Sequence, residues 1–371
     1  MPKPSYYPTK EAPSTLAVGV HAPYNRSISI DSYFEEFLNL IKTDQITYKE
    51  SLFIKLREID PGYFFSKGKL EDIKKACETH EIEQVIVSER LSPQQTRNLE
   101  DYLNCDIMDR TDLILEIFQK GALSAEGKTQ VEIALLQQQK SRLAGKGIHL
   151  SQQEGAVGLR GGPGETAKER ERRHIESQIL KLKQELKNIQ RTRDTQRKQR
   201  LGRKVPQICL IGYTNAGKST ILNELTKSNV LAEDKLFATL DTTTRALFIN
   251  SQQKGVLSDT VGFIQQLPPH LIEAFKSTLS ELQYADLLLH VVDVADSNWE
   301  SHIKVVHHIL DELEVHKPML YVFNKADKLP NMDQRAERIE QYQPNVVISA
   351  TSRKGIEPLI AYLHTWEPAS N

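Results

Sequence analysis

The chain has 371 residues, which is enough for two or three domains that each bury a core. Hydrophobic residues make up 39% of it and charged residues 26%, a balance that excludes a disordered chain. No apolar run approaches the roughly 20 residues of a membrane span, so we expect no membrane span. The N-terminal stretch "MPKPSYYPTKEAPSTLAVGV" also lacks the basic-then-apolar layout of a secretion signal.

The cysteines indicate a reducing compartment. Cys77, Cys105 and Cys209 are odd in number and far apart, which fits neither a disulfide framework nor a zinc site. We therefore expect a cytoplasmic protein.

Charge is unevenly distributed along the chain, although the formal net charge is only −1. Residues 165–204 contain fourteen Lys and Arg but six Asp and Glu, so the rest of the protein is acidic. A solvated helix face would account for such a segment. A surface that binds the phosphates of RNA would also account for it, and we favour that interpretation.

Residues 1–110 are predicted to form a small α/β domain of βαβ units. Between about residues 15 and 110 the chain alternates strand and helix patterns: "LAVGV" and "QVIVS" are of strand type, and "DSYFEEFLNLIKT" and "KGKLEDIKKACETHEI" are helical. In "SPQQTRNLEDYL", Ser92 is placed as N-cap and Pro93 at the first helical position.

Residues 111–204 are predicted to form a helical arm. Residues 111–145 have a helical pattern, and a glycine-rich loop at 145–164 precedes a second, long helix. In that helix apolar residues follow a heptad spacing, which requires one helical partner but lasts barely two heptads. We therefore expect an antiparallel pair with the helix around 126–145, and a monomer rather than a long coiled-coil dimer. The apolar positions are Ile175, Ile179, Leu182, Leu186 and Ile189.

Residues 205–371 alternate regularly between strand and helix patterns. The runs "VPQICLIG", "RALFIN", "GVLSD", "DLLLHVVD", "PMLYVFN" and "NVVIS" have strand length. Because they are apolar on both faces, they predict a mostly parallel sheet covered by helices. The fold class is therefore α/β throughout, with a helical arm between two domains.

The third domain begins with a phosphate-binding motif. "GYTNAGKST" (212–220) fits G-x-x-x-x-G-K-[ST] and follows the apolar strand "QICLI". Backbone N–H groups of such a loop turn toward phosphates at a helix N-terminus. We assign Lys218 to the β- and γ-phosphate charge and the Ser219 hydroxyl to Mg²⁺.

A second motif, "DTVGF" (259–263), has the form D-x-x-G. Asp259 ends a strand and can reach Mg²⁺ through water, and the Gly262 amide can contact the γ-phosphate. In signalling GTPases the next residue is a glutamine that orients the attacking water, whereas this chain has Phe263 there.

Two further motifs predict guanine specificity. In "NKAD" (324–327), Asp327 can accept hydrogen bonds from the N1 and N2 groups of guanine, which adenine lacks. Asn324 and Lys325 would support the base and the phosphate loop, and in "SAT" (349–351) the Ala350 amide can meet guanine O6. All four motifs follow strands in order, so they meet in one crevice. The chain is predicted to bind GTP.

A loop between residues 231 and 245 must supply a hydroxyl to Mg²⁺ when the γ-phosphate is present. Four residues of "LAEDKLFATLDTTTR" qualify, and the residues alone do not choose among them: Thr239, Thr242, Thr243 and Thr244.

These motifs together resemble the HflX family of translational GTPases, in the Obg–HflX branch of P-loop GTPases. In the third domain "GYTNAGKST", "LFATLD", "DTVGFIQQLPPHLIEAFKSTLSE" and "NKAD" are similar to its nucleotide-binding signatures. In the N-terminal half "KGKLEDI", "LSPQQTRNLE", "DRTDLILEIF", "EGKTQVEIA" and "RGGPGET" resemble hallmarks that other GTPase families lack.

The resemblance implies binding to the large ribosomal subunit and dissociation of ribosomes, particularly under stress. It places the Mg²⁺-binding threonine at Thr239 and agrees with the hydrophobic Phe263. The glycine loop "GLRGGPGE" is one residue longer than the usual version. Many members carry a further C-terminal domain where this sequence ends in "LHTWEPASN", so we expect its role to be absent or supplied elsewhere.

The candidate site residues form three sets. Lys218, Thr239 and Gly262 are the catalytic candidates, and Ser219 and Thr239 are the metal ligands. The predicted nucleotide contacts are Gly212, Tyr213, Thr214, Asn215, Ala216, Gly217, Lys218, Ser219, Phe237, Ala238, Thr239, Leu240, Asp241, Asp259, Thr260, Val261, Gly262, Asn324, Lys325, Ala326, Asp327, Ser349, Ala350 and Thr351.

Three hypotheses concern single positions. If Phe263 cannot place water, the isolated enzyme is slow and the large subunit stimulates it; alternatively Phe263 only packs in the core, and backbone amides hold the water.

Asn215 resembles asparagines that help bind K⁺ near the phosphates; the alternative is a hydrogen bond that stabilises the loop. Arg160 and its neighbouring glycines are placed against ribosomal RNA, with an unliganded hairpin as the alternative.

Two other functions compete with ribosome dissociation. One is a GTP-dependent switch that acts on other RNA or on a protein without splitting ribosomes; co-sedimentation with subunits discriminates the two. The other is a nucleotide hydrolase whose N-terminal domain binds a second nucleotide, which ATP binding by residues 1–150 would test.

Overall fold

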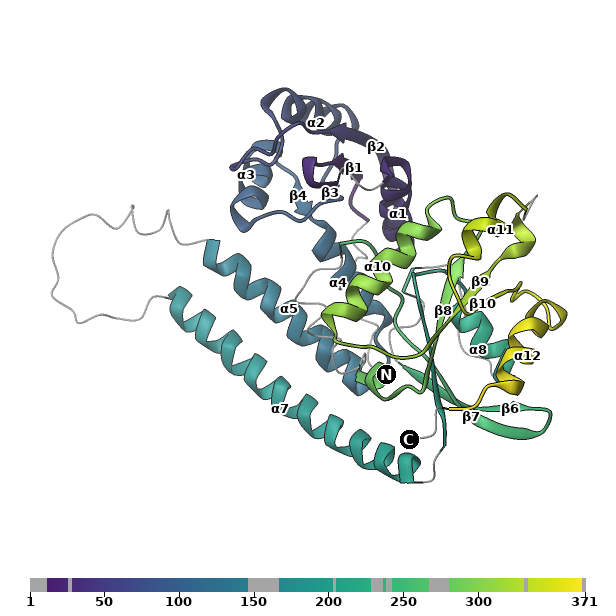
Figure 1. Ribbon diagram of the computed structural model, residues 1–371. Helices are drawn as coiled ribbons and strands as arrows, with labels where there is room; N and C mark the ends of the chain where they lie inside the picture. Colours follow the sequence, from purple (N-terminus) through teal and green to yellow (C-terminus); the bar gives the residue numbers. More distant parts are fainter. Residues whose placement is uncertain are drawn as a thin grey trace, which may run out of the picture. The chain divides into compact units, whose positions relative to one another are not determined.

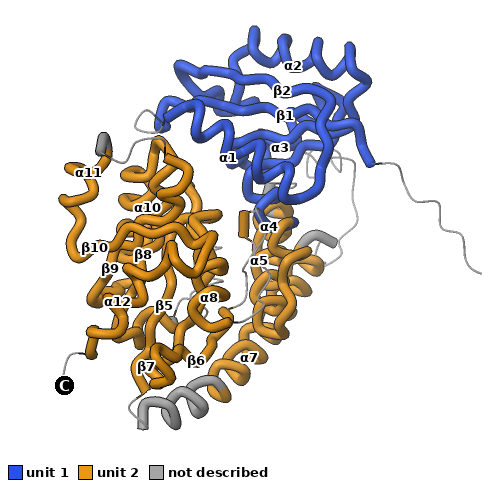
Figure 2. The backbone as a smooth tube through the Cα atoms, turned by 90° about the vertical axis from the view of Figure 1, so that its right-hand side faces the viewer, with its two compact units in different colours: residues 1–116, 144–156 blue, residues 117–143, 157–371 orange. Residues whose placement is uncertain are grey.

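The chain folds into two compact units, each with its own sheet (Figure 2). Unit 1 contains residues 1–116 and 144–156, and unit 2 contains residues 117–143 and 157–371. The predicted boundaries at residues 110 and 204 stay a prediction. None of the described helices is long and apolar enough to cross a membrane. The computed structural model describes residues 12–25, 29–145, 167–202, 205–227, 236–237, 242–266, 280–329 and 333–368.

Unit 1 contains a four-stranded parallel sheet in the order β2-β1-β3-β4, which confirms the predicted α/β fold there. Two of its strands escaped prediction. β2 is an edge strand whose side chains are mostly exposed, and β4 is only three residues long. The strands are β1 (Thr15–His21), β2 (Tyr48–Lys55), β3 (Gln84–Val87) and β4 (Asp106–Met108).

Helices pack on both faces of this sheet. Helices α2 and α3 pack over one face, where apolar residues of both helices join the strand residues in a single core. Helix α1 lies against β1, where Gly19 allows close approach: a Cβ there would lie 2.1 Å from Phe34 Cδ2. Ser92 caps α3 as predicted, in a reciprocal capping box with Gln95. The helices are η1 (Pro23–Asn25), α1 (Ile30–Thr43), α2 (Lys67–His80) and α3 (Pro93–Leu103).

The predicted helical arm consists of α4 (Arg110–Gly121), α5 (Ala125–Gly145) and α7 (Ala167–Gly202). Helices α5 and α7 run side by side in opposite directions (Figure 1). Their seam is an apolar cluster that contains the predicted Ile175 and Ile179, and Lys140 Nζ lies 2.9 Å from a Glu176 oxygen across it. The antiparallel pairing is therefore confirmed.

Unit 2 also contains a six-stranded sheet in the order β10-β9-β8-β5-β7-β6. All neighbouring pairs are parallel except β6 and β7, so the predicted mostly parallel sheet is confirmed. All six runs singled out in the sequence form its strands. These are β5 (Gln207–Gly212), β6 (Thr243–Ile249), β7 (Gln252–Asp259), β8 (Leu287–Asp293), β9 (Met319–Asn324) and β10 (Asn345–Val347).

Two pairs of helices cover this sheet. Helices α8 and α12 share one core with its apolar residues, and α10 and α11 share another that includes Trp299 and Phe323 (Figure 1). Both faces of the central strands are therefore buried, which explains why β5, β8 and β9 are apolar almost throughout. The helices are α8 (Lys218–Thr226), η2 (Ser280–Tyr284), α10 (Trp299–Glu312), η3 (Ala326–Lys328), α11 (Asp333–Ile339), η4 (Lys354–Ile356) and α12 (Glu357–Thr365).

Candidate nucleotide-binding site

The phosphate loop joins β5 to the N-terminus of α8, as the motif predicts. Gly212 and Gly217 both have positive φ, of 148° and 95°. A Cβ at Gly212 would lie 2.2 Å from the Val291 carbonyl oxygen, and one at Gly217 would lie 2.3 Å from Asn324 Nδ2. Both positions therefore require glycine, because the chain turns there against other strands.

Lys218 is buried inside this loop. Its Nζ donates hydrogen bonds to the carbonyl oxygens of Tyr213 at 2.8 Å and of Gly212 at 3.2 Å. Burial lowers the pKa of Lys218 to about 8, with Asp259 opposing this effect and Lys325 adding to it. Burial disfavours the charged form of this lysine, and a phosphate anion beside it would stabilise that charge.

The oxygen ligands proposed for Mg²⁺ lie together. Ser219 Oγ donates to Asp259 Oδ2 at 2.6 Å, where the start of α8 meets the end of β7. A hydroxyl and a carboxylate are hard oxygen donors of the kind that Mg²⁺ takes, so these residues fit the metal. Thr239, the other predicted ligand, lies outside the described residues.

The D-x-x-G loop lies directly against the phosphate loop. A Cβ at Gly262 would lie 2.9 Å from Thr214 Cα and 3.0 Å from Lys218 Nζ. Gly262 is thus held next to the ammonium that is assigned to the γ-phosphate. Thr260 anchors the start of this loop through a 2.7 Å hydrogen bond to the Leu210 carbonyl oxygen.

Phe263 joins the two loops through its backbone. Its N–H donates to Gly212 O at 3.1 Å, and its carbonyl accepts from Thr214 N at 2.8 Å. Its side chain is almost completely buried. Phe263 therefore holds the loops together, while its side chain offers no polar atom to a water molecule.

Asn324 connects the phosphate loop to the guanine motifs. Its Nδ2 donates to the Ala216 carbonyl oxygen at 2.9 Å, and its Oδ1 accepts from the Ala350 N–H at 3.0 Å. The Ala350 amide, predicted to meet guanine O6, is thus bonded to Asn324 in this structure. Ala350 is held at the site by the residue that also fixes the phosphate loop.

The remaining guanine residues are held in a second set of contacts. Ser349 Oγ donates to Asp327 Oδ1 at 2.5 Å and lies 2.8 Å from Thr351 Oγ1. The Ala326 N–H donates to the Ile348 carbonyl oxygen. The NKAD and SAT loops therefore form one wall of the site.

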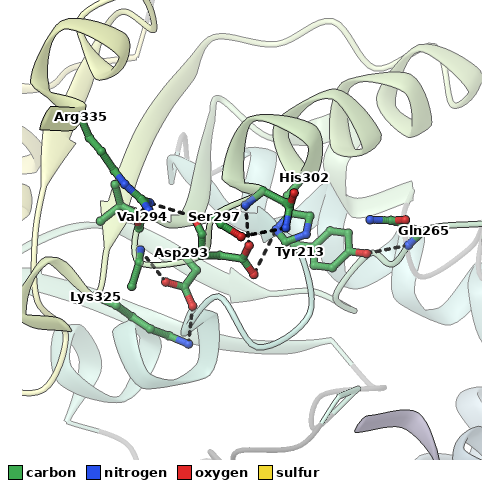
Figure 3. A network of polar contacts seen from close by, with 11 residues as sticks. Tyr213, Gln265, Asp293, Val294, Ser297, His302, Lys325 and Arg335 are labelled. Carbon is green, nitrogen blue, oxygen red and sulfur yellow. Dashed lines mark hydrogen bonds and ion pairs between the residues drawn. The ribbon is translucent and has the colours of Figure 1, made fainter. Parts of the chain in front are cut away.

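Three residues near the site escaped the sequence analysis. Asp293, at the end of β8, forms an ion pair with Lys325, in which Lys325 Nζ lies 2.7 Å from Asp293 Oδ2 (Figure 3). Its place after an apolar strand was an available signal. Gln265 and His302 had none: the Gln265 N–H donates to the Tyr213 hydroxyl at 2.9 Å, and His302 stacks on the Tyr213 ring at 3.8 Å between centroids (Figure 3).

Of the loop before Thr239, the structure describes residues 236–237. Phe237 has a left-handed φ of 56° and packs edge-on against Phe118 of α4, with ring centroids 4.6 Å apart. Asn215 also has a left-handed φ, of 59°, which asparagine tolerates better than most residues. Four predicted contacts and the glycine-rich loop with Arg160 lie outside the described residues. The four contacts are Ala238, Thr239, Leu240 and Asp241.

Comparison with known families agrees with this arrangement. Residues 31–119 match the family described as "GTP-binding GTPase N-terminal", residues 121–200 match "GTP-binding GTPase Middle Region", and residues 207–325 match "50S ribosome-binding GTPase". The chain is 45% identical over 330 residues to GTPase HflX of Magnetococcus marinus, covering 89% of this chain and 76% of that protein. The chain belongs to the HflX family of GTPases.

Two other relatives agree with this assignment. GTPase HflX of Escherichia coli (strain K12) is 40% identical over 349 residues, which cover 94% of this chain and 82% of that protein. A solved structure described as "crystal structure of SsGBP and GDP complex" is 26% identical, with a TM-score of 0.51, and covers 95% of this chain and 97% of that chain. This HflX protein therefore binds guanine nucleotides and hydrolyses GTP to GDP and phosphate.

Proposed function

We propose that this HflX GTPase binds the large ribosomal subunit and uses GTP to dissociate or remodel ribosomes, with stress as the setting in which it acts. The observation that carries the proposal is the match of residues 207–325 to a family described as a 50S ribosome-binding GTPase. The protein is proposed to act as a cytoplasmic monomer, which is in keeping with its three free, buried thiols.

The domains would divide this work among residues 1–110, 111–204 and 205–371. The last of these binds the nucleotide. Helix α7 supports a role of the arm in RNA binding, because the basic side chains that the structure describes on it lie on the exposed face, away from the apolar seam. The exposed ones include Arg172, Arg173, Lys181, Lys183, Lys187 and Arg191. Phosphate contacts of this kind supply sequence-independent affinity.

In the proposed site, each end of the nucleotide has its own residues. Lys218 neutralises charge on the β- and γ-phosphates, and Asp327 binds the edge of the guanine base. Ser349 and Asn324 hold the wall formed by the NKAD and SAT loops in place. Ser219 and Thr239 would hold Mg²⁺, which when bound neutralises charge that develops on the phosphates. K⁺ beside Asn215 stays a proposal, and the comparison of turnover in KCl and in NaCl tests it.

The Gly262 amide is proposed to contact the γ-phosphate, beside Lys218. Phe263 has a buried, apolar side chain with no amide group to orient water, so hydrolysis by the isolated protein should be slow. A bound large subunit would order the loops at 231–245 and 259–270 and so restore the geometry.

Co-sedimentation with purified ribosomal subunits tests the proposal. We expect the chain to pellet with large subunits in a non-hydrolysable GTP analogue and much less in GDP, and to shift intact ribosomes toward free subunits. Binding without a shift would support the alternative of a GTP switch that does not split ribosomes. Equal binding in both nucleotides would contradict the proposal.

The arm is tested separately with a matched pair of charge reversals. The double variant Lys183→Glu/Lys187→Glu on α7 should weaken binding and flatten its salt dependence, because fewer counterions are released. The double variant Lys67→Glu/Lys75→Glu, on the exposed surface of α2, is the control with the same change in charge and should leave binding unchanged. Equal loss in both variants would contradict a specific role for α7.

A further inference from the structure

The phosphate loop contains a buried hydroxyl that the described structure leaves without a partner. Thr214 is only 6% exposed, and its Oγ1 has no hydrogen-bond partner among the described residues. A buried polar atom normally has a hydrogen-bond partner, and burying a hydroxyl without one is unfavourable in free energy. An unpaired hydroxyl inside a nucleotide site is therefore able to bond to a partner that arrives with the ligand.

The backbone of Thr214 is held in place. Its N–H donates to the Phe263 carbonyl oxygen at 2.8 Å, as part of the bridge between the two loops. The next residue toward the N-terminus, Tyr213, accepts a hydrogen bond from the Gln265 N–H on the same loop. The position of Thr214 is thus fixed relative to the D-x-x-G loop.

The side chain of Thr214 flanks Gly262. A Cβ built on Gly262 would lie 2.9 Å from Thr214 Cγ2 and 3.0 Å from Lys218 Nζ. The Thr214 methyl group and the Lys218 ammonium therefore both pack against Gly262. The threonine side chain thus lies beside the two groups that are assigned to the γ-phosphate.

GTP hydrolysis requires a water molecule that is oriented toward the γ-phosphorus. The water oxygen forms the new bond to phosphorus, and the bond from phosphorus to the β–γ bridging oxygen breaks with its electron pair passing to GDP. The water protons end on the released phosphate and in solvent. Orientation and charge stabilisation account for nearly all of the catalysis, and Phe263 offers neither.

We propose that Thr214 is a catalytic residue whose hydroxyl accepts a hydrogen bond from the attacking water. A hydroxyl has two acceptor lone pairs and one donor, so it can orient water while it donates to a phosphate oxygen. This role supplies within the phosphate loop part of what the glutamine of signalling GTPases supplies from the D-x-x-G loop.

A matched set of variants of the full chain tests this role in the absence of ribosomes. Thr214→Val removes the hydroxyl and keeps the branched shape, whereas Thr214→Ser keeps the hydroxyl. We expect single-turnover hydrolysis of bound GTP to fall by roughly 10- to 100-fold in Thr214→Val and by less than about threefold in Thr214→Ser. The affinities for GDP and for a non-hydrolysable GTP analogue should fall far less than the rate in both variants.

Three results would overturn the proposal. The first is hydrolysis by Thr214→Val at the unaltered rate. The second is equal slowing in Thr214→Ser, which would assign the effect to the shape of the side chain. The third is a loss of affinity for the GTP analogue as large as the loss of rate. Because Oγ1 bonds to no described residue, Thr214→Val should fold; if it does not, Thr214→Ala is measured against Thr214→Ser by the same criteria. The measurement uses no ribosome, so its outcome is separate from that of the ribosome experiments.

Discussion

The pKa of Lys218 links burial to nucleotide binding at the scale of one residue. Burial lowers it to about 8, and phosphate anions beside the ammonium would raise it again. A group whose pKa is higher in the complex than in the free protein takes up a proton on binding. The affinity that this proton uptake contributes is complete below the lower pKa and is lost progressively as the pH rises from the lower pKa to the higher one.

We therefore expect GDP affinity to be constant below about pH 7 and to weaken from about pH 8 upward, approaching tenfold per pH unit. Calorimetry of GDP binding in buffers of different ionisation enthalpy should show net proton uptake at about pH 8. Affinity that stays level across this range, with no proton uptake, would show that Lys218 is already fully charged in the free protein.

Asp327 is the residue that we expect to decide which base is bound. Its carboxylate accepts hydrogen bonds, whereas the amide of Asp327→Asn also donates one, and would face a donor group of guanine. Xanthine has a carbonyl oxygen at that position. We expect GDP affinity to fall by at least roughly 100-fold and affinity for xanthosine diphosphate to rise.

Asp311→Asn is the control for this substitution, because Asp311 is an exposed residue of α10. It should leave both affinities unchanged. If Asp327→Asn retains its preference for guanine, the base is read by other residues.

At the scale of elements, the pairing of α5 and α7 depends on a narrow apolar seam. Ile179 is 9% exposed within that seam, and its neighbour Leu180 is 69% exposed on the same helix. Ile179→Ala should cost about 2–4 kcal/mol, because it leaves a cavity between the helices. Leu180→Ala should cost less than about 0.5 kcal/mol.

Hydrogen exchange of the segments 125–143 and 169–192 measures this difference locally, which matters because a chain of several units need not unfold in one step. Ile179→Ala should speed exchange in both segments, and Leu180→Ala in neither. Equal protection in the two variants would mean that the seam does not hold the pair together.

The elements also show what the sequence could and could not predict. The six strands of the second sheet were predictable because each contains an apolar run, and in β5, β8 and β9, which helices bury on both faces, the run is nearly continuous. The edge strand β2 has charged and apolar residues in no clear alternation, and the three residues of β4 are too few to show a period. The edge position of β2 and the short length of β4 remove the hydropathy pattern by which a strand is predicted from sequence.

The site follows the same division. Its motif residues were predictable because each chemical role needs particular residue types at a fixed spacing. The bonds of Phe263 to Gly212 and Thr214 were not, since backbone pairing between distant loops leaves no mark on side-chain identity. Nor could the sequence show that Asn324 takes the Ala350 amide, because that contact depends on how two strand ends meet.

At the scale of the whole molecule, the buried Phe263 and the proposed ribosomal partner lead to one expectation. A GTPase that lacks a side-chain amide after D-x-x-G should depend on a partner to order its loops, and Thr214 alone would supply only part of the geometry. Steady-state GTP turnover with and without saturating large ribosomal subunits measures this dependence. We expect at least a roughly tenfold increase with large subunits and none with small subunits. Turnover that is unchanged at saturating large subunit would contradict the claim that this GTPase acquires its catalytic competence on the ribosome.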